Sequence, residues 1–360
     1  MILLFSFWYL SSYLSYSFKG TDFPTFYNAA STIIDNDTPS RAVYEIDFEN
    51  KYSIPEMPIR DFIYSIPSAY IMAPLALMPY YTAKSAMIFI NILMYLGGVA
   101  IALRLGGATG RSFFYLFALS ILWMPFIINL FYVQVNAVLF FLISVAILAA
   151  TKNRPIWCGT LLGVAALFKI FPVAIAMVLG LKNWRIFAAC FVVLGLSLSI
   201  PGSTKWFSVI GNIHPAGYTP VYLWLKECGP ALFLLYSGSI AGVTALIVHK
   251  ARKASYPFLA SFAIPAMFLT MPHVQSHHFT LLMFSFAYAL AYIFSGTSKD
   301  SNMILLLSIF ISIVIIQFQL PLSSIFGLFL IWIAFGYQLV KVSINFKEQE
   351  IKTAHIKNYC

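Results

Sequence analysis

Side chains able to do acid–base or anion-binding chemistry are scarce in this sequence of 360 residues, and they stand at the ends of long apolar runs. Asp22 follows the first apolar run directly. A carboxylate at the boundary of a membrane segment is costly, and it therefore points to a function. Two interpretations of Asp22 stay open and are compatible: a general base, or the N-cap of a helix over 23–34.

Lys169 and a pair of histidines are the next candidates. Lys169, in LFKIFP, is the sole charge between Arg154 and Lys182. An ammonium so deep in an apolar segment needs a partner, and an anionic phosphate headgroup is a natural one; the alternative is a lysine that extends its charge to the interface. His277 and His278, in TMPHVQSHHF, could donate to a phosphate or position a nucleophile, because imidazole titrates near neutrality.

Two further patterns could hold a metal ion. Asp35-Asn36-Asp37 has the DxD form that some metal-dependent sugar transferases use, but Asp-Asn-Asp-Thr-Pro is also ordinary turn chemistry, which we favour. His273 and His277 have the i, i+4 spacing of a zinc site without a third ligand. Since there is also no P-loop or dinucleotide fingerprint, we expect neither a metal nor a cofactor.

The composition dictates what must position these residues. Hydrophobic residues make up 61% of the chain and charged residues only 9%, and the mean hydropathy is +0.84. Soluble domains have about 45–50% apolar and about 25% charged residues. Runs free of Asp, Glu, Lys and Arg cover 112–151, 254–298 and 301–340, each long enough for two membrane spans of about 20 residues. The sequence predicts an all-α polytopic membrane protein.

The charges predict its topology. Eight of the 12 acidic residues lie between Asp22 and Asp61, whereas basic residues form short clusters between later apolar runs. The positive-inside rule places such clusters in the cytoplasm. The net charge of +10 reflects this orientation and contact with membrane lipids rather than nucleic acid. All clusters are cytoplasmic if 12 helices cross, with both termini inside, near 1–18, 84–103, 112–131, 136–151, 155–168, 170–181, 186–200, 229–248, 255–271, 278–294, 302–317 and 322–340.

The count of 12 crossings depends on two assignments. The segment 62–83, interrupted by three prolines, is expected to lie in the outer interface without crossing, and 155–181 is expected to enter and return as two short helices. We expect one membrane domain over 1–341, an outer loop over 19–83 with interfacial helices, and a cytoplasmic tail over 342–360. The face of Phe23, Phe26, Tyr27, Ala30, Ile33 and Ile34 predicts an amphipathic helix on the membrane. Asp22, the turn Gln134–Asn136, Lys169 and the histidines all fall at outer ends.

Several motifs, taken in order, resemble a known family. They are GTDFPTFYNAASTI with a later Val43–Tyr44, SIPSAYIMAPLALMP, VQVNAVLFFL, GVAALFKIFPVAI and TMPHVQSHHF. Together they resemble glycosyltransferase family 87, whose members are GT-C type transferases that use a polyprenyl-phosphate sugar, the best known of them mannosyltransferases. The chain departs from the pattern at Val133, where glycine is usual, and at Gln275, where tryptophan is usual.

The resemblance implies a hexosyltransferase, with mannose favoured, that takes its sugar from a polyprenyl-phosphate donor and passes it to a lipid or glycan acceptor. It implies a GT-C type bundle in the plasma membrane and an active site on the periplasmic or extracellular face, in the cell envelope. Asp22 matches the position of the general base, and Lys169 and His277 match groups that hold the donor phosphate. His278, Gln134 and Asn136 match further substrate-binding positions.

Two other classes of function stay open. A transporter or flippase of lipid-linked sugars is compatible with Lys169 and the helix break at Pro172, although no repeated pair of broken helices is visible. An O-antigen-type ligase or polymerase also uses lipid-linked sugars on the outer face, but such enzymes usually carry their large functional loop late in the chain.

Overall fold

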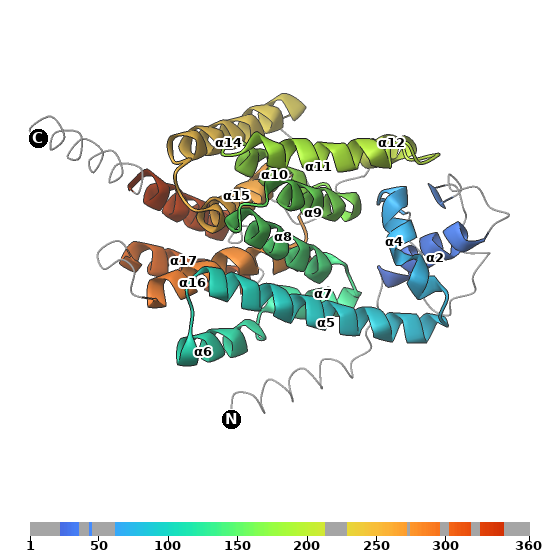
Figure 1. Ribbon diagram of the computed structural model, residues 1–360, viewed down its shortest axis with the longest axis horizontal. Helices are drawn as coiled ribbons and strands as arrows, with labels where there is room; N and C mark the ends of the chain where they lie inside the picture. The colour runs from blue at the N-terminus through green and yellow to red at the C-terminus, as the bar shows by residue number, and fades with distance from the viewer. Residues whose placement is uncertain are drawn as a thin grey trace, which may run out of the picture.

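The computed structural model describes residues 22–35, 43–44, 62–212, 229–271, 274–295, 302–317 and 325–341, and every regular element within these ranges is helical (Figure 1). The helices are α2 (Phe23–Ile34), α4 (Ile66–Ala76), α5 (Tyr80–Leu105), α6 (Gly110–Ser120), α7 (Met124–Tyr132), α8 (Asn136–Thr151), α9 (Pro155–Phe168), α10 (Pro172–Gly180), α11 (Trp184–Ser197), α12 (Lys205–Asn212), α14 (Pro230–Lys250), α15 (Tyr256–Thr270), the 3-10 helix η2 (Ser276–Leu282), α16 (Met283–Phe294) and α17 (Asn302–Gln317). A last apolar helix covers Ile325–Lys341.

Most of the predicted helices are confirmed, four of them with the same bounds: 23–34, 136–151, 155–168 and 302–317. The predicted helix 1–18 lies outside the described residues. The predicted single helix 112–131 is wrong, because α6 and α7 are separate and bend by 48° at the break between them. Pro125 explains the break, since proline lacks the amide proton and its ring clashes with the carbonyl four residues earlier.

The described helices are consistent with a membrane protein, but not all are long enough to cross alone. Tyr80–Leu105 and Ser276–Phe294 pass by length and composition, and the bent pair α6–α7 makes a third if it is one span. Within the described residues, eight other apolar helical stretches have 10–17 residues, among them Leu234–Lys250 of α14. The count of 12 crossings is not confirmed by these lengths.

The helices α9, α10 and α11 alternate in direction. A Cβ on Gly159 would lie 2.2 Å from the Ile186 carbonyl oxygen, and one on Gly163 would lie 3.0 Å from the Cys190 carbonyl oxygen. Because the contact moves forward along both helices, α9 and α11 are parallel, and α10, which joins them in the chain, runs in the opposite direction, as predicted for 155–181. The turns before α9 and before α11 therefore share one end of the bundle, and Lys169 lies at the other.

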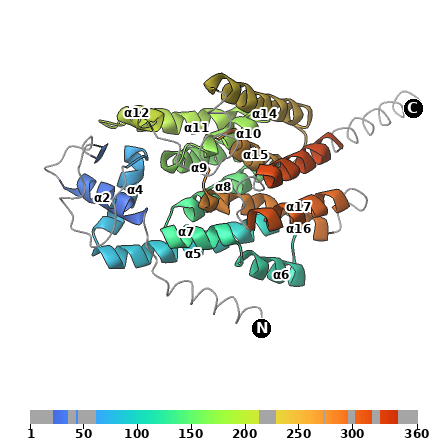
Figure 2. The same cartoon turned by 180° about the vertical axis from the view of Figure 1, so that it is seen from behind.

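The helices α2 and α4 lie together at one end of the molecule, beside the start of α5, and the view from behind shows the same arrangement (Figures 1 and 2). Phe23 and Phe26 of α2 are buried, and Phe26 stacks on Tyr64 at 4.4 Å between ring centroids. The apolar face of 23–34 was expected to lie on the membrane. It is instead covered largely by protein, which fixes the position of the preceding residue, Asp22.

Candidate functional site

Four short segments carry the candidate residues, and each is placed by the end of a helix. Asp22 precedes α2, Gln134 and Asn136 join α7 to α8, Lys169 joins α9 to α10, and the histidines lie in η2. The structure links the first three segments by hydrogen bonds and brings the fourth against them through aromatic contacts.

The Asp22 side chain makes no capping hydrogen bond to α2. Its Oδ2 instead accepts a hydrogen bond of 2.7 Å from Nε2 of Gln134. The Asp22 side chain therefore does not cap α2, a role that the sequence left open. The residue is half-buried, and a carboxylate is by its chemistry a group that can accept hydrogen bonds or a proton.

Gln134 bridges Asp22 to an aromatic residue that the sequence did not single out. The same Nε2 also donates to the Tyr64 hydroxyl at 3.1 Å. The Tyr64 backbone carbonyl accepts from the Tyr44 hydroxyl at 2.7 Å, and the neighbouring Ser65 hydroxyl donates to the Leu167 carbonyl at 2.5 Å. These bonds tie the segment before α4 to the end of α9, close to Lys169.

Asn136 orients Lys169. The Lys169 ammonium, whose residue is 8% exposed, donates to Oδ1 of Asn136 at 3.0 Å. The backbone N–H and Nδ2 of Asn136 both donate to Oδ1 of Asn129, at 3.2 and 3.0 Å. This second pair of bonds fixes which way the Asn136 amide faces. Asn129 is thus a positioning residue that sequence reasoning missed.

Asp22 and Lys169 stand on two sides of the same turn. Gln134 contacts the carboxylate, Asn136 contacts the ammonium, and the two charges are near enough to interact electrostatically. The turn between them contains Val133 in the left-handed region, with φ 52° and ψ 48°. Its shape lets Gln134 and Asn136 point toward different charged partners.

The histidine pair packs against both turns. The rings of His277 and His278 lie 4.5 Å apart at 81°, and both residues are buried. His277 contacts the ring of Tyr132 at 5.5 Å, and His278 contacts that of Phe171 at 5.1 Å. Nδ1 of His278 accepts from the Gln275 backbone N–H at 3.1 Å, so the neutral ring carries its proton on Nε2.

The metal patterns are not supported by the described residues. Within them, no group of three His, Cys, Asp or Glu side chains could hold an ion. Asp35 lies at the far end of α2 from Asp22, about 20 Å along a helix that rises 1.5 Å per residue. Asn36, Asp37 and His273 lie outside the described residues.

The arrangement combines a carboxylate that can accept a proton, a buried ammonium that can bind an anion, and two imidazoles against the same turns.

The sequence comparisons agree with a sugar-transfer chemistry. Residues 62–210 match the family model of glycosyltransferase family 87, a match that contains Gln134, Asn136 and Lys169 and indicates a glycosyltransferase. The resemblance drawn from the motifs is thereby confirmed over this range. No curated protein and no solved structure matches the chain.

Proposed function

Starting from the match of residues 62–210 to glycosyltransferase family 87, we propose that this chain is a membrane hexosyltransferase with its active site around Asp22 and Lys169. The donor is a polyprenyl-phosphate sugar, with mannose favoured, and the acceptor is a hydroxyl group of a lipid or glycan. The observation that carries the proposal is the turn from Gln134 to Asn136, which contacts a carboxylate on one side and a buried ammonium on the other.

The proposed reaction is one displacement with inversion at the anomeric carbon. The acceptor hydroxyl oxygen forms the new bond to this carbon, while the bond from the carbon to the phosphate oxygen breaks. Asp22 takes the hydroxyl proton, a contribution typically worth about 10²–10⁴-fold in rate. Lys169 and His277 stabilise the charge that develops on the leaving phosphate, and His278 supports them. Because the phosphate is a good leaving group, the reaction needs no nucleotide.

The proposed architecture is a GT-C type bundle with about 12 crossings. The basic turns at Lys152 and Lys182 lie at the opposite end from Lys169, because α9 and α11 are parallel. The positive-inside rule places the basic end in the cytoplasm and the site at the outer face of the plasma membrane. The helices α9 and α10, with 14 and 9 residues, reach about 21 and 14 Å, which is short of a hydrocarbon core of about 30 Å. Lys169 therefore lies below the outer surface, where a lipid phosphate can reach it from the bilayer.

Replacement of Asp22 tests the proposal. We expect Asp22→Asn to lower transfer from a radiolabelled polyprenyl-phosphate sugar by about 10²–10⁴-fold in reconstituted protein, because the amide cannot take the proton. Asp35→Asn is the matched control, since it makes the same change at the other end of α2, and it should keep activity. Near-normal transfer by folded Asp22→Asn protein would remove the proposed base.

The same assay separates transfer from transport, the alternative that the break between α9 and α10 at Lys169 favours. Transfer releases polyprenyl phosphate and labels the acceptor. A transporter would move the intact donor across the vesicle membrane and release no polyprenyl phosphate. Lys169→Gln should raise the KM for the donor in the first case.

A further inference from the structure

The backbone just before α4 is held by side chains from two distant parts of the sequence. Trp206 of α12 donates from Nε1 to the Ile63 carbonyl at 3.1 Å, and the Tyr44 hydroxyl donates to the Tyr64 carbonyl at 2.7 Å. Because residues 63–65 lie outside the helices, these side chains rather than a helical ladder satisfy the two carbonyl groups. The backbone around Tyr64 is therefore fixed.

The Tyr64 ring is also held in place. Tyr64 is 7% exposed, and its ring stacks on that of Phe26 in α2 at 4.4 Å between centroids. The Phe62 ring packs edge-on against it at 5.6 Å. Contacts of both kinds favour particular orientations of the rings. The Tyr64 hydroxyl consequently has a fixed place beside the Gln134 amide, from which it accepts a hydrogen bond.

The Gln134 amide uses its protons within the protein. Nε2 donates to Oδ2 of Asp22 at 2.7 Å and to the Tyr64 hydroxyl at 3.1 Å, and Oε1 accepts from the Val135 N–H at 3.3 Å. A primary amide has two N–H donors. Since Gln134 is 3% exposed and both donors have acceptors, Nε2 could bind a sugar hydroxyl only at the expense of Asp22 or Tyr64. This geometry suits a residue that orients the carboxylate.

The orientation of the Asp22 carboxylate is not set by its own helix. Asp22 precedes α2 and makes no capping hydrogen bond to it. A general base must lie within hydrogen-bond reach of the proton that it removes, and a displacement of about 1 Å can cost about 10²-fold in rate. The bond from Gln134 restricts the Asp22 side chain, and the bond to Tyr64 restricts the Gln134 amide in turn.

We propose that Gln134 and Tyr64 are positioning residues that orient Asp22 for proton transfer, and that Trp206 of α12 supports them through the Ile63 carbonyl. The inference rests on the proposed role of Asp22 as the general base. It gives Gln134 a role different from the substrate binding that the family resemblance implies. The acceptor hydroxyl then meets a carboxylate whose direction is set before the substrate binds.

Kinetics of the reconstituted full-length protein, with radiolabelled polyprenyl-phosphate mannose as the donor, separate positioning from substrate binding. Gln134→Met removes the amide and keeps an unbranched side chain. We expect kcat to fall roughly 10- to 100-fold, because a hydrogen bond to a charged group is lost, while the KM for the donor changes less than about threefold. Gln338→Met makes the same change at a buried glutamine of the helix Ile325–Lys341, outside the candidate site, and should keep kcat.

A double-mutant cycle shows whether Tyr64 acts through Asp22. Tyr64→Phe keeps the ring, removes the hydroxyl and should lower kcat about fivefold. In a protein that already carries Asp22→Asn, the same substitution should change the residual single-turnover rate less than about twofold, because no base is left to orient. Tyr95→Phe is the control, since Tyr95 is also buried and its hydroxyl donates to the Ser120 carbonyl at 2.7 Å. It should keep kcat even if it lowers the unfolding midpoint.

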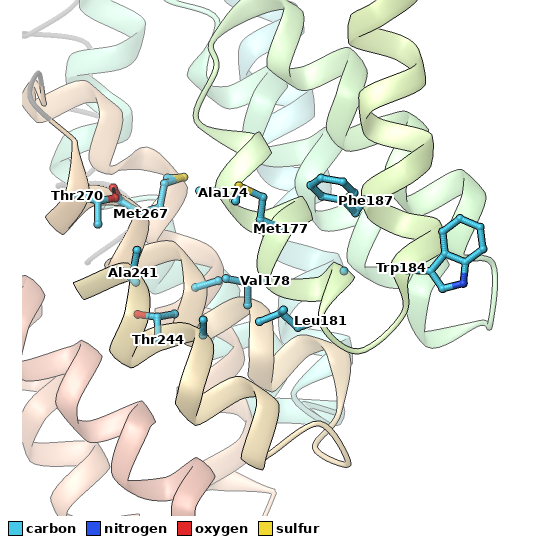
Figure 3. A pocket seen from close by; sticks show the side chains of 14 residues that line it. Ala174, Met177, Val178, Leu181, Trp184, Phe187, Ala241, Thr244, Met267 and Thr270 are labelled. Atoms are coloured by element: carbon cyan, nitrogen blue, oxygen red, sulfur yellow. Dashed lines mark hydrogen bonds between the residues drawn. The ribbon is translucent and has the colours of Figure 1, made fainter. Parts of the chain in front are cut away.

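A tryptophan pair tests the contribution of α12. Trp206→Phe removes the hydrogen bond to the Ile63 carbonyl and should lower kcat about threefold with the KM for the donor unchanged. Trp184→Phe makes the same change at a residue that is 70% exposed and lines an apolar groove between α10, α14 and α15 on the side of the bundle (Figure 3). This control should keep kcat.

An unchanged kcat in folded Gln134→Met or Tyr64→Phe protein, beside an Asp22→Asn protein that has lost transfer, would overturn the positioning roles and leave the general base in place. A raised KM with kcat preserved in Gln134→Met would overturn them as well, because Gln134 would then bind substrate. An unchanged kcat in Trp206→Phe would remove α12 from the inference. Near-normal transfer by Asp22→Asn would overturn the proposed function and this inference together. If Gln134→Met does not fold, the Tyr64→Phe cycle decides the outcome.

Discussion

Val133 adopts a backbone conformation that its side chain disfavours. It is β-branched, fully buried and in the left-handed region, and it stands between α7 and the Gln134–Asn136 turn. Such a residue costs about 1–2 kcal/mol relative to one in an ordinary region. The family pattern has glycine at this position, and glycine adopts this conformation without the cost. This conformational cost arises in the turn whose residues Gln134 and Asn136 contact Asp22 and Lys169.

The left-handed conformation of Val133 predicts that glycine is more stabilising than alanine at this position, which reverses their usual order in a helix. Val133→Gly should be more stable than Val133→Ala by about 1 kcal/mol, because both remove the isopropyl group but only glycine tolerates a positive φ. At Val138, inside α8, the order should reverse by a similar amount, because alanine is the better helix former. Thermal unfolding of the four variants in detergent measures both differences. The same order at both positions would contradict the conformation of Val133.

Part of the candidate site could be predicted from single residues and part could not. Asp22 and Lys169 stand out in the sequence because charged residues are rare next to long apolar runs. Tyr64 and Asn129 give no such signal. Tyrosine occurs 21 times in this chain, and the role of each of these two residues depends on contacts that only the tertiary structure forms.

At the scale of elements, α9 and α11 pack closely against each other. Gly159 and Gly163 stand four residues apart and let the two backbones approach, as small residues commonly do in membrane helices. This contact keeps α9 and α11 parallel, and it thereby holds Lys169 at the opposite end from the basic turns. Gly195, on α11, plays no such part, because a methyl group added there would meet no atom within 4 Å.

Gly159→Ala should therefore destabilise the protein by about 1–3 kcal/mol, because the new methyl group would lie 2.2 Å from the Ile186 carbonyl oxygen. Gly195→Ala should be neutral or stabilise by up to about 1 kcal/mol, because alanine favours the helix and has room. Unfolding midpoints of the two proteins in the same detergent make the comparison. A Gly159→Ala protein as stable as Gly195→Ala would contradict the close approach of α9 and α11.

Proline shows why element bounds were only partly predictable. The break between α6 and α7 occurs at Pro125, yet Pro265 lies inside the continuous helix α15 and Pro74 lies inside α4. A membrane helix tolerates proline when neighbouring groups satisfy the freed backbone carbonyl. Because that depends on the surroundings in the fold, the sequence 112–131 did not distinguish a kink from a continuous helix.

At the scale of the whole molecule, the two ends of the bundle differ in chemistry. Helix α8 begins at Asn136, beside Lys169, and ends at Thr151, beside Lys152 and Arg154. Its 16 residues separate the candidate site from the basic turns by about 24 Å. Helix α11 begins at Trp184, next to Arg185 on the basic turns, and ends at Ser197, and Ser199 lies just beyond this other end. Thr151 and Ser199 are both exposed and mark opposite ends.

The accessibility of Thr151 and Ser199 from outside the cell tests the membrane orientation on which the proposed function depends. In protein whose native cysteines are replaced by alanine, a membrane-impermeant maleimide should label Ser199→Cys in intact cells. Thr151→Cys should react only after the membrane is permeabilised, because the positive-inside rule holds the basic turns in the cytoplasm. The reverse pattern would place the sugar-transfer site inside the cell, where activated nucleotide sugars would compete as donors. Labelling of both positions from one side would contradict the parallel course of α9 and α11, because that course puts Thr151 and Ser199 on opposite faces.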